Sequence, residues 1–507
     1  MKTNVLLLFL LFFTIKNIES QELNLHKSEV FKDIGRDSRL AFYDEDNSGN
    51  TFVLRKFYGG IDRKVRIYLL ERYDSKLNKK ESKEFLEKNI KELFVKNGYL
   101  HLILLEDEGK NKKFNYKVLR SPVQKFDFES FKLFLDKDAM LAHTVDVNKN
   151  SLTTNYFNET HNGYTGEVMI SKNKNFIGLN LQLNNIKNET NRIAVFNLNF
   201  EKIFEHEVQQ NLKDKRYEFN SFLIDDVDGS VYFLGKYKPN FLQKVKLSNE
   251  EPFSFNMFKI NKDSEQVLEF KTGDNFISSL KLLESDNKLM CVGLYSTSEN
   301  KATKGIAYYQ IDKNSLSVHE NNFLELKSKN IKNLNLKKVL VDQDENLYVA
   351  AEERYVVGTP APGSQFSVRS SNQSFHFDNI HFAKIDNKGD LDWYYQLHKS
   401  QSSSRNYFVY FSYLFNLIDN KPYLVFNSNQ KKILKDGELN IRSTSLDKMF
   451  LYALVFDQNG EYSLKLLDHD KSKKITFKTL QGLVNKNSFL LEGDFKKNKQ
   501  ILKLKQG

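Results

Sequence analysis

Residues that usually fix a fold or carry chemistry are scarce in this sequence. Its 507 residues include one cysteine, one tryptophan and six prolines. The lone cysteine, Cys291, excludes an intrachain disulfide, and its apolar surroundings, KLMCVGLY, predict a buried, inert thiol rather than a nucleophile. The length alone would suggest several domains. However, no stretch rich in proline, glycine and serine divides the chain, so no linker is indicated.

Local catalytic signatures are also missing. The sequence contains no nucleophile elbow, Walker loop, HExxH motif or Rossmann glycine pattern. HEVQQ at 206–210 lacks the second histidine of a zincin, and DHD at 468–470 is interpreted as a polar loop. We therefore expect no cofactor, no metal site and no catalytic residue that a short motif would reveal. A site assembled from distant parts of the chain stays open.

One acidic stretch, DQDENLYVAAEE at 342–353, resembles a calcium loop in part. Asp342, Asp344 and Glu353 fall where an EF-hand loop places its first, third and twelfth ligands. That loop needs glycine at its sixth position, where this chain has Leu347, and it needs flanking helices where this chain predicts strands. The stretch is therefore interpreted as an acidic hairpin turn, not as a calcium site.

Only the first residues form a long apolar run. Residues 5–15 are almost wholly apolar, but a membrane span takes roughly 20 apolar residues. A short basic start and this run predict a secretory signal peptide at 1–20, cut after Ser20 so that the mature chain begins at Gln21. We expect no transmembrane segment after signal removal, and peripheral association with a membrane stays open.

Export without disulfides is more typical of a bacterial envelope than of an animal secretory pathway. We therefore expect an exported protein of the periplasm or outer membrane, with the cell surface as a further alternative. The formal net charge is +11, and lysines and acids alternate along the whole length. Nucleic-acid binding needs a concentrated basic face. The even spread argues against nucleic acid and favours an envelope partner such as an anionic polysaccharide, lipid headgroups or an acidic protein.

What the sequence does contain is a repeat of strand, turn and strand. Its clear copies are LAFYDEDNSGNTFVLRK, LFVKNGYLHLILLE, VMISKNKNFIGLNLQ, FLIDDVDGSVYFLGKY, LKLLESDNKLMCVGLY, VLVDQDENLYVAAEE, LFNLIDNKPYLVFNS and LVNKNSFLLEGDF. A second hairpin, such as FNMFKINKDSEQVLEFK, follows most copies, so each unit comprises four antiparallel strands. The sequence therefore predicts an all-β fold: a single β-propeller over 21–507, with eight blades favoured and seven left open.

Several details of this propeller are less regular. FKLFLDKDAMLAHTV is a ninth candidate copy, and we expect the hairpins near 137 and 174 to share one enlarged blade. The C-terminal ILKLK is expected to complete a blade begun near residue 29 or 39. Residues 77–94 form the only serious helix candidate, and NYFVYFSYLF at 406–415 predicts a strand covered on both faces. Trp393 is expected to pack between blades.

A family resemblance accompanies this repeat. RIAVFNLNFEKIFEHEV followed by FNSFLIDDVDGSVYFLGKY resembles an uncharacterised family of exported β-propeller-like proteins of Gram-negative bacteria. The block from LYVAAEERYVVGTPAPGSQF to HFDNIHFAKIDNKGDLDWYYQL is similar to a long hairpin late in those chains. The resemblance spans about residues 125–495 and implies a fold and a compartment. It implies no activity, because no catalytic residue accompanies that family.

The most distinctive segment is the long hairpin 354–378. Between its expected strands lies more chain than a tight turn requires, and such loops often carry function. We expect it to protrude and to contact a partner through apolar, aromatic and arginine side chains, which are common at interfaces. The residues predicted for this contact are Arg354, Tyr355, Phe366, Val368, Arg369, Phe375 and Phe377.

Two classes of function remain at this point. The first is a binding or scaffolding module of the cell envelope that contacts a protein or glycan partner. The alternative is a polysaccharide-active lyase or hydrolase whose site is assembled across blades. The missing catalytic signatures favour the first class, but a propeller fold by itself decides neither.

Overall fold

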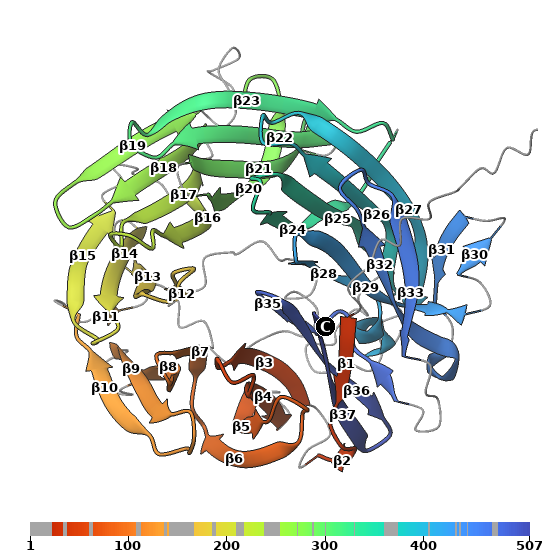
Figure 1. Cartoon of the computed structure of the whole chain (residues 1–507). Helices are drawn as coiled ribbons and strands as arrows, with labels where there is room; N and C mark the ends of the chain where they lie inside the picture. Colours follow the sequence, from red (N-terminus) through yellow and green to blue (C-terminus); the bar gives the residue numbers. More distant parts are fainter. Residues whose placement is uncertain are drawn as a thin grey trace, which may run out of the picture.

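We describe the fold from a computed structural model. It describes residues 23–506, except 34–37, 60–63, 108–112, 136–138, 141–166, 185–188, 209–216, 238–253, 271, 286–287, 300, 329, 359–373, 404–405, 431–432, 436–437, 444 and 469–474. The described strands form eight sheets that stand side by side around a central axis (Figure 1). The fold is therefore an eight-bladed β-propeller built on four-stranded antiparallel blades, which confirms the predicted fold class.

The first four blades follow one another along the chain, each running from an inner to an outer strand. Blade 1 contains β3 (Ser38–Glu45), β4 (Thr51–Gly59), β5 (Lys64–Tyr73) and β6 (Lys79–Leu86). Blade 2 contains β7 (Ile90–Lys96), β8 (Tyr99–Asp107), β9 (Lys113–Pro122), β10 (Glu129–Leu133) and the short β11 (Ala139–Met140). Blade 3 contains β12 (Glu167–Ile170), β13 (Phe176–Asn184), β14 (Glu189–Asn197) and β15 (Lys202–Val208). Blade 4 contains β16 (Tyr217–Ile224), β17 (Val231–Tyr237), β18 (Ser254–Ile260) and β19 (Glu265–Phe270).

The last four blades carry the additions to the basic pattern. Blade 5 contains β20 (Phe276–Glu284), β21 (Lys288–Ser296), β22 (Thr303–Asp312) and β23 (Ser317–Glu325). Blade 6 contains β24 (Leu334–Val341), β25 (Leu347–Val357), β26 (Ser374–Ile385) and β27 (Leu391–Ser403). Blade 7 contains β28 (Tyr413–Ile418), β29 (Lys421–Asn429), β32 (Met449–Phe456) and β33 (Tyr462–Asp468). Blade 8 contains β34 (Thr476–Phe477), β35 (Leu483–Asn485), β36 (Ser488–Phe495), β37 (Asn498–Gln506), β1 (Leu23–Lys27) and β2 (Phe31–Lys32). Two turns of 3-10 helix, η1 (Asn406–Tyr410) and η3 (Leu446–Lys448), and the added strands β30 (Leu434–Lys435) and β31 (Glu438–Arg442) complete the set.

Burial explains why the second strand of a blade is so apolar. The second strand of blade 5, β21 (KLMCVGLYS), is buried at every position except its first, because neighbouring blades cover both faces. Cys291 lies here with no exposed surface, and burial raises the pKa of its thiol, as expected for an inert group. The outer strand of blade 1, β6 (KKESKEFL), is mostly exposed and rich in charge. Trp393 stacks on Phe456 of blade 7 with ring centroids 5.7 Å apart, so its predicted role between blades is confirmed.

Acidic residues begin many of the hairpin turns, and their role is to cap the turn. The Asp342 side chain accepts hydrogen bonds from the backbone N–H groups of Asp344 (2.9 Å) and Asn346 (2.8 Å). Equivalent pairs of bonds reach the aspartates of four other hairpins, namely Asp46, Asp74, Asp386 and Asp457. The segment from 342 is thus a hairpin turn between two strands, as predicted.

Strands from both chain ends close the ring, as expected. β1 pairs with β37 from Leu23↔Gln506 to Lys27↔Leu502, and β2 pairs with it at Phe31 and Lys32, so the N-terminal part of this blade lies near residue 29 and not near 39. The expectation of one enlarged blade is wrong. β10 and β11 both pair with β9 and so belong to blade 2, whereas β12 opens the separate blade 3.

Two further segments take a local structure of their own. The helix candidate at 77–94 contains two strands, because residues 79–86 pair with β5 and residues 90–96 pair with β8. The segment at 406–415, predicted as one strand, begins with the 3-10 turn η1, and its strand β28 starts only at Tyr413.

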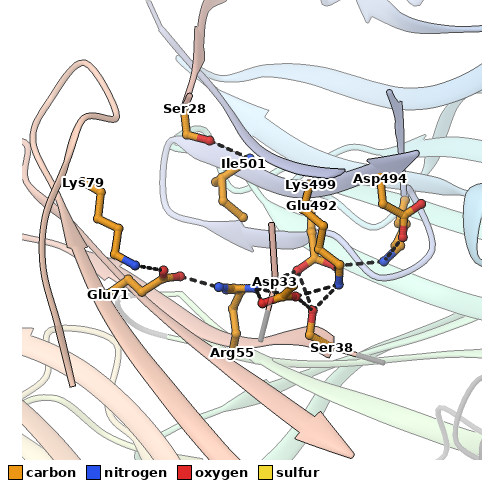
Figure 2. Close-up of polar contacts among 11 residues, drawn as sticks. Ser28, Asp33, Ser38, Arg55, Glu71, Lys79, Glu492, Asp494, Lys499 and Ile501 are labelled. Atoms are coloured by element: carbon orange, nitrogen blue, oxygen red, sulfur yellow. Dashed lines mark hydrogen bonds and ion pairs between the residues drawn. The ribbon is translucent and has the colours of Figure 1, made fainter. Parts of the chain in front are cut away.

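A buried group of charges joins the first and last blades. We call Asp33, Ser38, Arg55, Glu71, Glu492 and Lys499 the closure cluster (Figure 2). Arg55 pairs through Nη1 with Asp33 (2.9 Å) and through Nε with Glu71 (2.8 Å). Lys499 pairs with Asp33 (2.9 Å) and with Glu492 (3.1 Å), so β4 of blade 1 and both long strands of blade 8 share one network.

The closure cluster keeps Glu492 ionised although it is buried. Burial alone would raise the pKa of this carboxyl, but Lys478, Lys499 and Arg55 together lower it to about 2. The same two influences act on Asp33, where Arg55 and Lys499 outweigh burial and lower the pKa. Residues far apart in the sequence therefore depend on each other's charges at the closure of the ring.

Candidate functional site: a polar pocket where the ladder of blade 6 is interrupted

The structure places four of the seven predicted contact residues at the root of the long hairpin. Arg354 and Tyr355 lie near the end of β25, and Phe375 and Phe377 lie at the start of β26. The two strands extend further than expected, up to the pair Val357↔Ser374. The other three predicted residues, Phe366, Val368 and Arg369, lie outside the described residues, and so does the rest of 359–373.

Three of these root side chains are buried, and for Phe375 and Phe377, which were expected to be exposed, that expectation is wrong. Phe375 packs on Phe408, with ring centroids 4.7 Å apart, and Phe377 packs edge-on against Phe411. Arg354 is buried and donates from Nε to Glu352 at 2.6 Å. These groups anchor the hairpin to η1 and blade 7, so their apolar and basic character has a structural reason. Their role in contacting a partner stays a prediction.

Tyr355 lies in a more open position. Its ring stacks on His376, with centroids 4.7 Å apart, and its hydroxyl donates to Asp378 Oδ2 at 2.7 Å. That hydrogen bond is the main cause that raises the pKa of Tyr355 to about 12. The next two residues, Val356 and Val357, are exposed apolar groups at the root.

The strand ladder of blade 6 is interrupted just below this root. Between β25 and β26 the pairing jumps from Glu352↔Ile380 to Arg354↔Phe377, which leaves Glu353 out of register. Between β26 and β27 it jumps from Ile380↔Leu397 to Phe377↔Gln401. Bulges of this kind turn side chains away from the regular sheet and are common beside functional sites.

An extra strand extends the sheet beyond β27, on the edge that faces away from β26. β31, which comes from the connection between β29 and β32 of blade 7, pairs in parallel with β27 (Figure 1). Its register joins His398 to Asn440 and Ser400 to Arg442. A pocket of about 520 Å³ opens between this added strand and the bulged residues. The pocket is lined by Glu353, Asp378, Asn379, His398, Lys399, Ser400, Glu438, Leu439, Asn440 and Arg442.

Behind the pocket lies a buried group of charges, Glu352, Arg354 and Lys399, which we call the blade-6 triad. Lys399 Nζ lies 2.8 Å from Glu352 Oε1 and donates to the carbonyl of Phe377 at 2.7 Å. Burial would raise the pKa of Glu352, but Lys399, Arg354 and Lys337 lower it to about 2. Burial lowers the pKa of Lys399, against the pull of Glu352. The triad therefore fixes the floor of the pocket to the root of the hairpin.

Several lining groups are held in place by neighbours. Glu353 Oε1 accepts from Asn379 Nδ2 at 3.2 Å and lies 2.8 Å from His381 Nε2. The other ring nitrogen of His381 lies 2.7 Å from the Tyr394 hydroxyl. Asn379 also accepts from the backbone N–H of Lys399 at 3.3 Å. The inner wall of the pocket is thus a preorganised hydrogen-bonding surface.

The outer wall is different, because its charges face solvent. Glu438, His398 and Arg442 are exposed side chains. Among the described residues none of the three has an ion-pair partner, and within that part of the chain the Arg442 guanidinium donates only from Nε, to Asn440 at 2.9 Å. Within the same described part, no group of three or more His, Cys, Asp or Glu side chains could hold a metal ion. The arrangement offers both donors and acceptors to a polar ligand.

Sequence reasoning missed this pocket entirely. One signal was present, since the polar pair Asp378 and Asn379 interrupts the otherwise apolar strand SFHFDNIHFAKI. The contribution of β31 had no comparable signal, because the strand lies in a connection of the next blade. A pocket formed by two blades depends on pairings that no single segment reveals.

Comparisons with known proteins find only distant similarities. The β-propeller domain of the Trilobed protease from Pyrococcus furiosus is 8% identical, with 87% of this chain and 98% of that chain covered and a TM-score of 0.41. Polysaccharide lyase Uly1 is 10% identical, with 82% of this chain and 90% of that chain covered and a TM-score of 0.40. Prolyl oligopeptidase B from Galerina marginata is 7% identical, with 90% of this chain and 56% of that chain covered and a TM-score of 0.41. No protein-family model and no curated protein matched the sequence. Resemblance at these identities concerns the fold alone, so the Gram-negative exported family stays a prediction.

Proposed function

We propose that this protein is an exported binding or scaffolding module of the cell envelope, which holds a protein or glycan partner at blade 6. The observation that carries the proposal is the pocket at the interrupted ladder, next to the root of the long hairpin. Its inner wall is held by hydrogen bonds, and its outer wall presents Glu438, His398 and Arg442 without ion-pair partners among the described residues. Preorganised groups of this kind favour binding, because little ordering is needed when a ligand arrives.

The compartment is part of the proposal. It rests on the signal peptide predicted at 1–20, and among the described residues no helix is long and apolar enough to cross a membrane. Mass spectrometry of protein recovered from the envelope fraction of an expressing bacterium tests it. We expect a mature chain that begins at Gln21. An uncut chain in the cytoplasm would contradict export.

The partner is tested by replacing the end of the hairpin. A deletion of 356–378 would remove the buried Phe375 and Phe377 from the core, so the replacement is limited to residues 358–373. Because Val357 pairs with Ser374, a two-residue Asn-Gly turn can join them directly. Tagged mature protein should recover a partner from solubilised native envelope, and the replacement should reduce that recovery at least tenfold.

A matched control exists in the neighbouring blade. Ser296 pairs with Thr303 at the corresponding connection of blade 5, so residues 297–302 can be replaced by the same Asn-Gly turn. This control should recover the partner as the unchanged protein does. Equal recovery by both variants would contradict a role of the hairpin. Release of shortened polysaccharide from a recovered glycan would instead support the lyase or hydrolase alternative.

A further inference from the structure

We propose that the blade-6 pocket binds a neutral, polyhydroxylated ligand, namely a sugar unit of an uncharged glycan. The inference rests on the proposed binding function and names the class of ligand that the pocket accepts. It follows from the groups that line the pocket and from the way in which they are held.

The lining disfavours the other common classes of small ligand. Leu439 is its only apolar residue, and its side chain is buried, so an apolar ligand would find little surface to cover. No group of three or more possible metal ligands occurs among the described residues. An anion would face the carboxylates of Glu353, Asp378 and Glu438. Of the two lysine and arginine side chains in the lining, Lys399 is already paired with Glu352, so Arg442 alone would face three carboxylates.

The lining matches the hydroxyl groups of a sugar. Each hydroxyl can both donate and accept a hydrogen bond. Two neighbouring hydroxyls can therefore bond to both polar atoms of one planar group, such as a carboxylate, an amide or a guanidinium. The pocket presents such groups on both walls: Glu353, Asp378 and Asn379 on the inner wall, and Glu438, Asn440 and Arg442 on the outer wall. Its volume of about 520 Å³ is in the range of small-ligand pockets, roughly 300–1,000 Å³.

The bulges explain how these groups come to face one ligand. On a regular ladder successive side chains point to opposite faces. Here the pairing skips Glu353 on β25, and it skips Asp378 and Asn379 on β26. The parallel pairing of β27 with β31 then brings His398 beside Asn440 and Ser400 beside Arg442. Three strands of one blade and an inserted strand from a connection of the next thus form one polar cavity.

The test uses the mature protein and a panel of defined oligosaccharides. The neutral members are oligomers of glucose, mannose, galactose and N-acetylglucosamine, and the acidic members are oligogalacturonates. Array screening is followed by calorimetric titration of each sugar that binds. We expect at least one neutral oligosaccharide to bind at millimolar or lower concentration, more tightly than any acidic member.

Substitutions in the pocket and at a control position then test whether the sugar binds in the pocket. Glu438→Ala and His398→Ala remove exposed groups, so the fold should be retained, and each should weaken binding roughly tenfold, because a hydrogen bond to a charged group contributes about 1.5–3 kcal/mol. His319→Ala and Glu325→Ala change exposed residues on β23, the corresponding outer strand of blade 5, and should bind as the unchanged protein does.

The outcomes separate this inference from the proposed function. The inference is overturned if no neutral sugar binds at millimolar concentration, if acidic members bind better, or if the pocket variants bind normally. In these cases the hairpin replacement still reports on the proposed function. If the hairpin replacement then loses the partner, the proposed binding of a protein partner at blade 6 still stands. If it recovers the partner unchanged, both the proposed function and the sugar-binding inference are contradicted.

Discussion

The closure cluster and the blade-6 triad are both buried glutamates paired with lysine and arginine, but they lie in different structural settings. Each centres on a glutamate in the middle of a blade's second strand: Glu492 on β36 and Glu352 on β25. Both carboxyls are almost fully buried (2% and 0% exposed), and in both cases lysine and arginine neighbours lower the pKa to about 2. By these measures alone, the two regions could not be told apart.

The difference lies in the strand ladder beside each glutamate. β36 and β37 pair without a register shift from Ser488↔Lys505 to Phe495↔Asn498, so the ladder that joins the two long strands of blade 8 is regular at Glu492. The blade-1 members of the closure cluster do lie beside shifts, at Leu40/Phe42 and Arg72/Tyr73. Next to Glu352 the ladder is shifted on both sides of β26, and the residues released from pairing line a pocket. A buried charged group therefore indicates a structural joint by itself, even beside a bulge. It indicates a candidate site where the residues at the bulge also line a pocket.

The largest expected effect is the loss of Arg55 from the closure cluster. Arg55→Met leaves Asp33, Glu71 and Glu492 with too few cations in a buried place. Breaking a buried pair in this way typically costs 3–5 kcal/mol, so we expect a loss of about 5 kcal/mol in the free energy of unfolding. Urea unfolding followed by circular dichroism measures it.

Arg442→Met is the control, because Arg442 is exposed and makes no ion pair with a described residue. Its stability should change by less than about 0.5 kcal/mol. If Arg55→Met costs less than about 1 kcal/mol, as exposed ion pairs do, the closure cluster does not hold the ring together.

A somewhat smaller loss is expected at the blade-6 triad. Glu352→Gln keeps the shape of the side chain but leaves Lys399 and Arg354 without their carboxylate. We expect a loss of about 3 kcal/mol in the same urea experiment. Adding Lys399→Met should recover part of it, since one uncompensated charge is then removed. A double variant less stable than Glu352→Gln would mean that Lys399 has a further role, for instance through its bond to the Phe377 carbonyl.

Acid should weaken both regions over the same pH range. The pKa of Glu352 and of Glu492 falls from its ordinary value of 4.5 to about 2 on folding. A lowered carboxyl pKa stabilises the fold fully above the ordinary value, and that stabilisation is lost as pH falls through the folded value. The thermal midpoint should therefore drop steeply between pH 4.5 and about 2. Glu352→Gln should show a flatter curve there, and an unchanged slope would contradict the ionised state of Glu352.

Much of this fold could be predicted from the sequence because it repeats. Eight strand–turn–strand copies each correspond to the first two strands of a blade, and the aspartate caps explain the acidic turns that mark them. The errors fell where pairing partners decide the structure. Residues 131–133 and 139–140 belong to the ninth candidate copy but pair back onto β9. Residues 79–86 and 90–96, which overlap the helix candidate at 77–94, are strands of two different sheets.

The candidate site was predictable only in its location. The length of the hairpin drew attention to blade 6, but Phe375 and Phe377 turned out to be buried anchors. Their burial depends on Phe408 and Phe411, which approach only when blade 7 packs on blade 6. The pocket depends in turn on β31, whose pairing with β27 joins residues of different blades. Local sequence patterns do not record contacts of this kind.

The smallest effect on stability is expected at the outer wall of the pocket, and this prediction sharpens the comparison most. His398→Ala and Glu438→Ala remove exposed side chains that have no ion-pair partner among the described residues, so each should change the free energy of unfolding by less than about 0.5 kcal/mol. If the pocket binds a partner and the closure cluster does not, these two variants should reduce recovery of a partner from the envelope although they hardly change stability. Variants at Lys79, an exposed member of the pairs around the closure cluster, should leave recovery unchanged. Reduced recovery with Lys79→Ala and normal recovery with both pocket variants would reverse the assignment of the two regions.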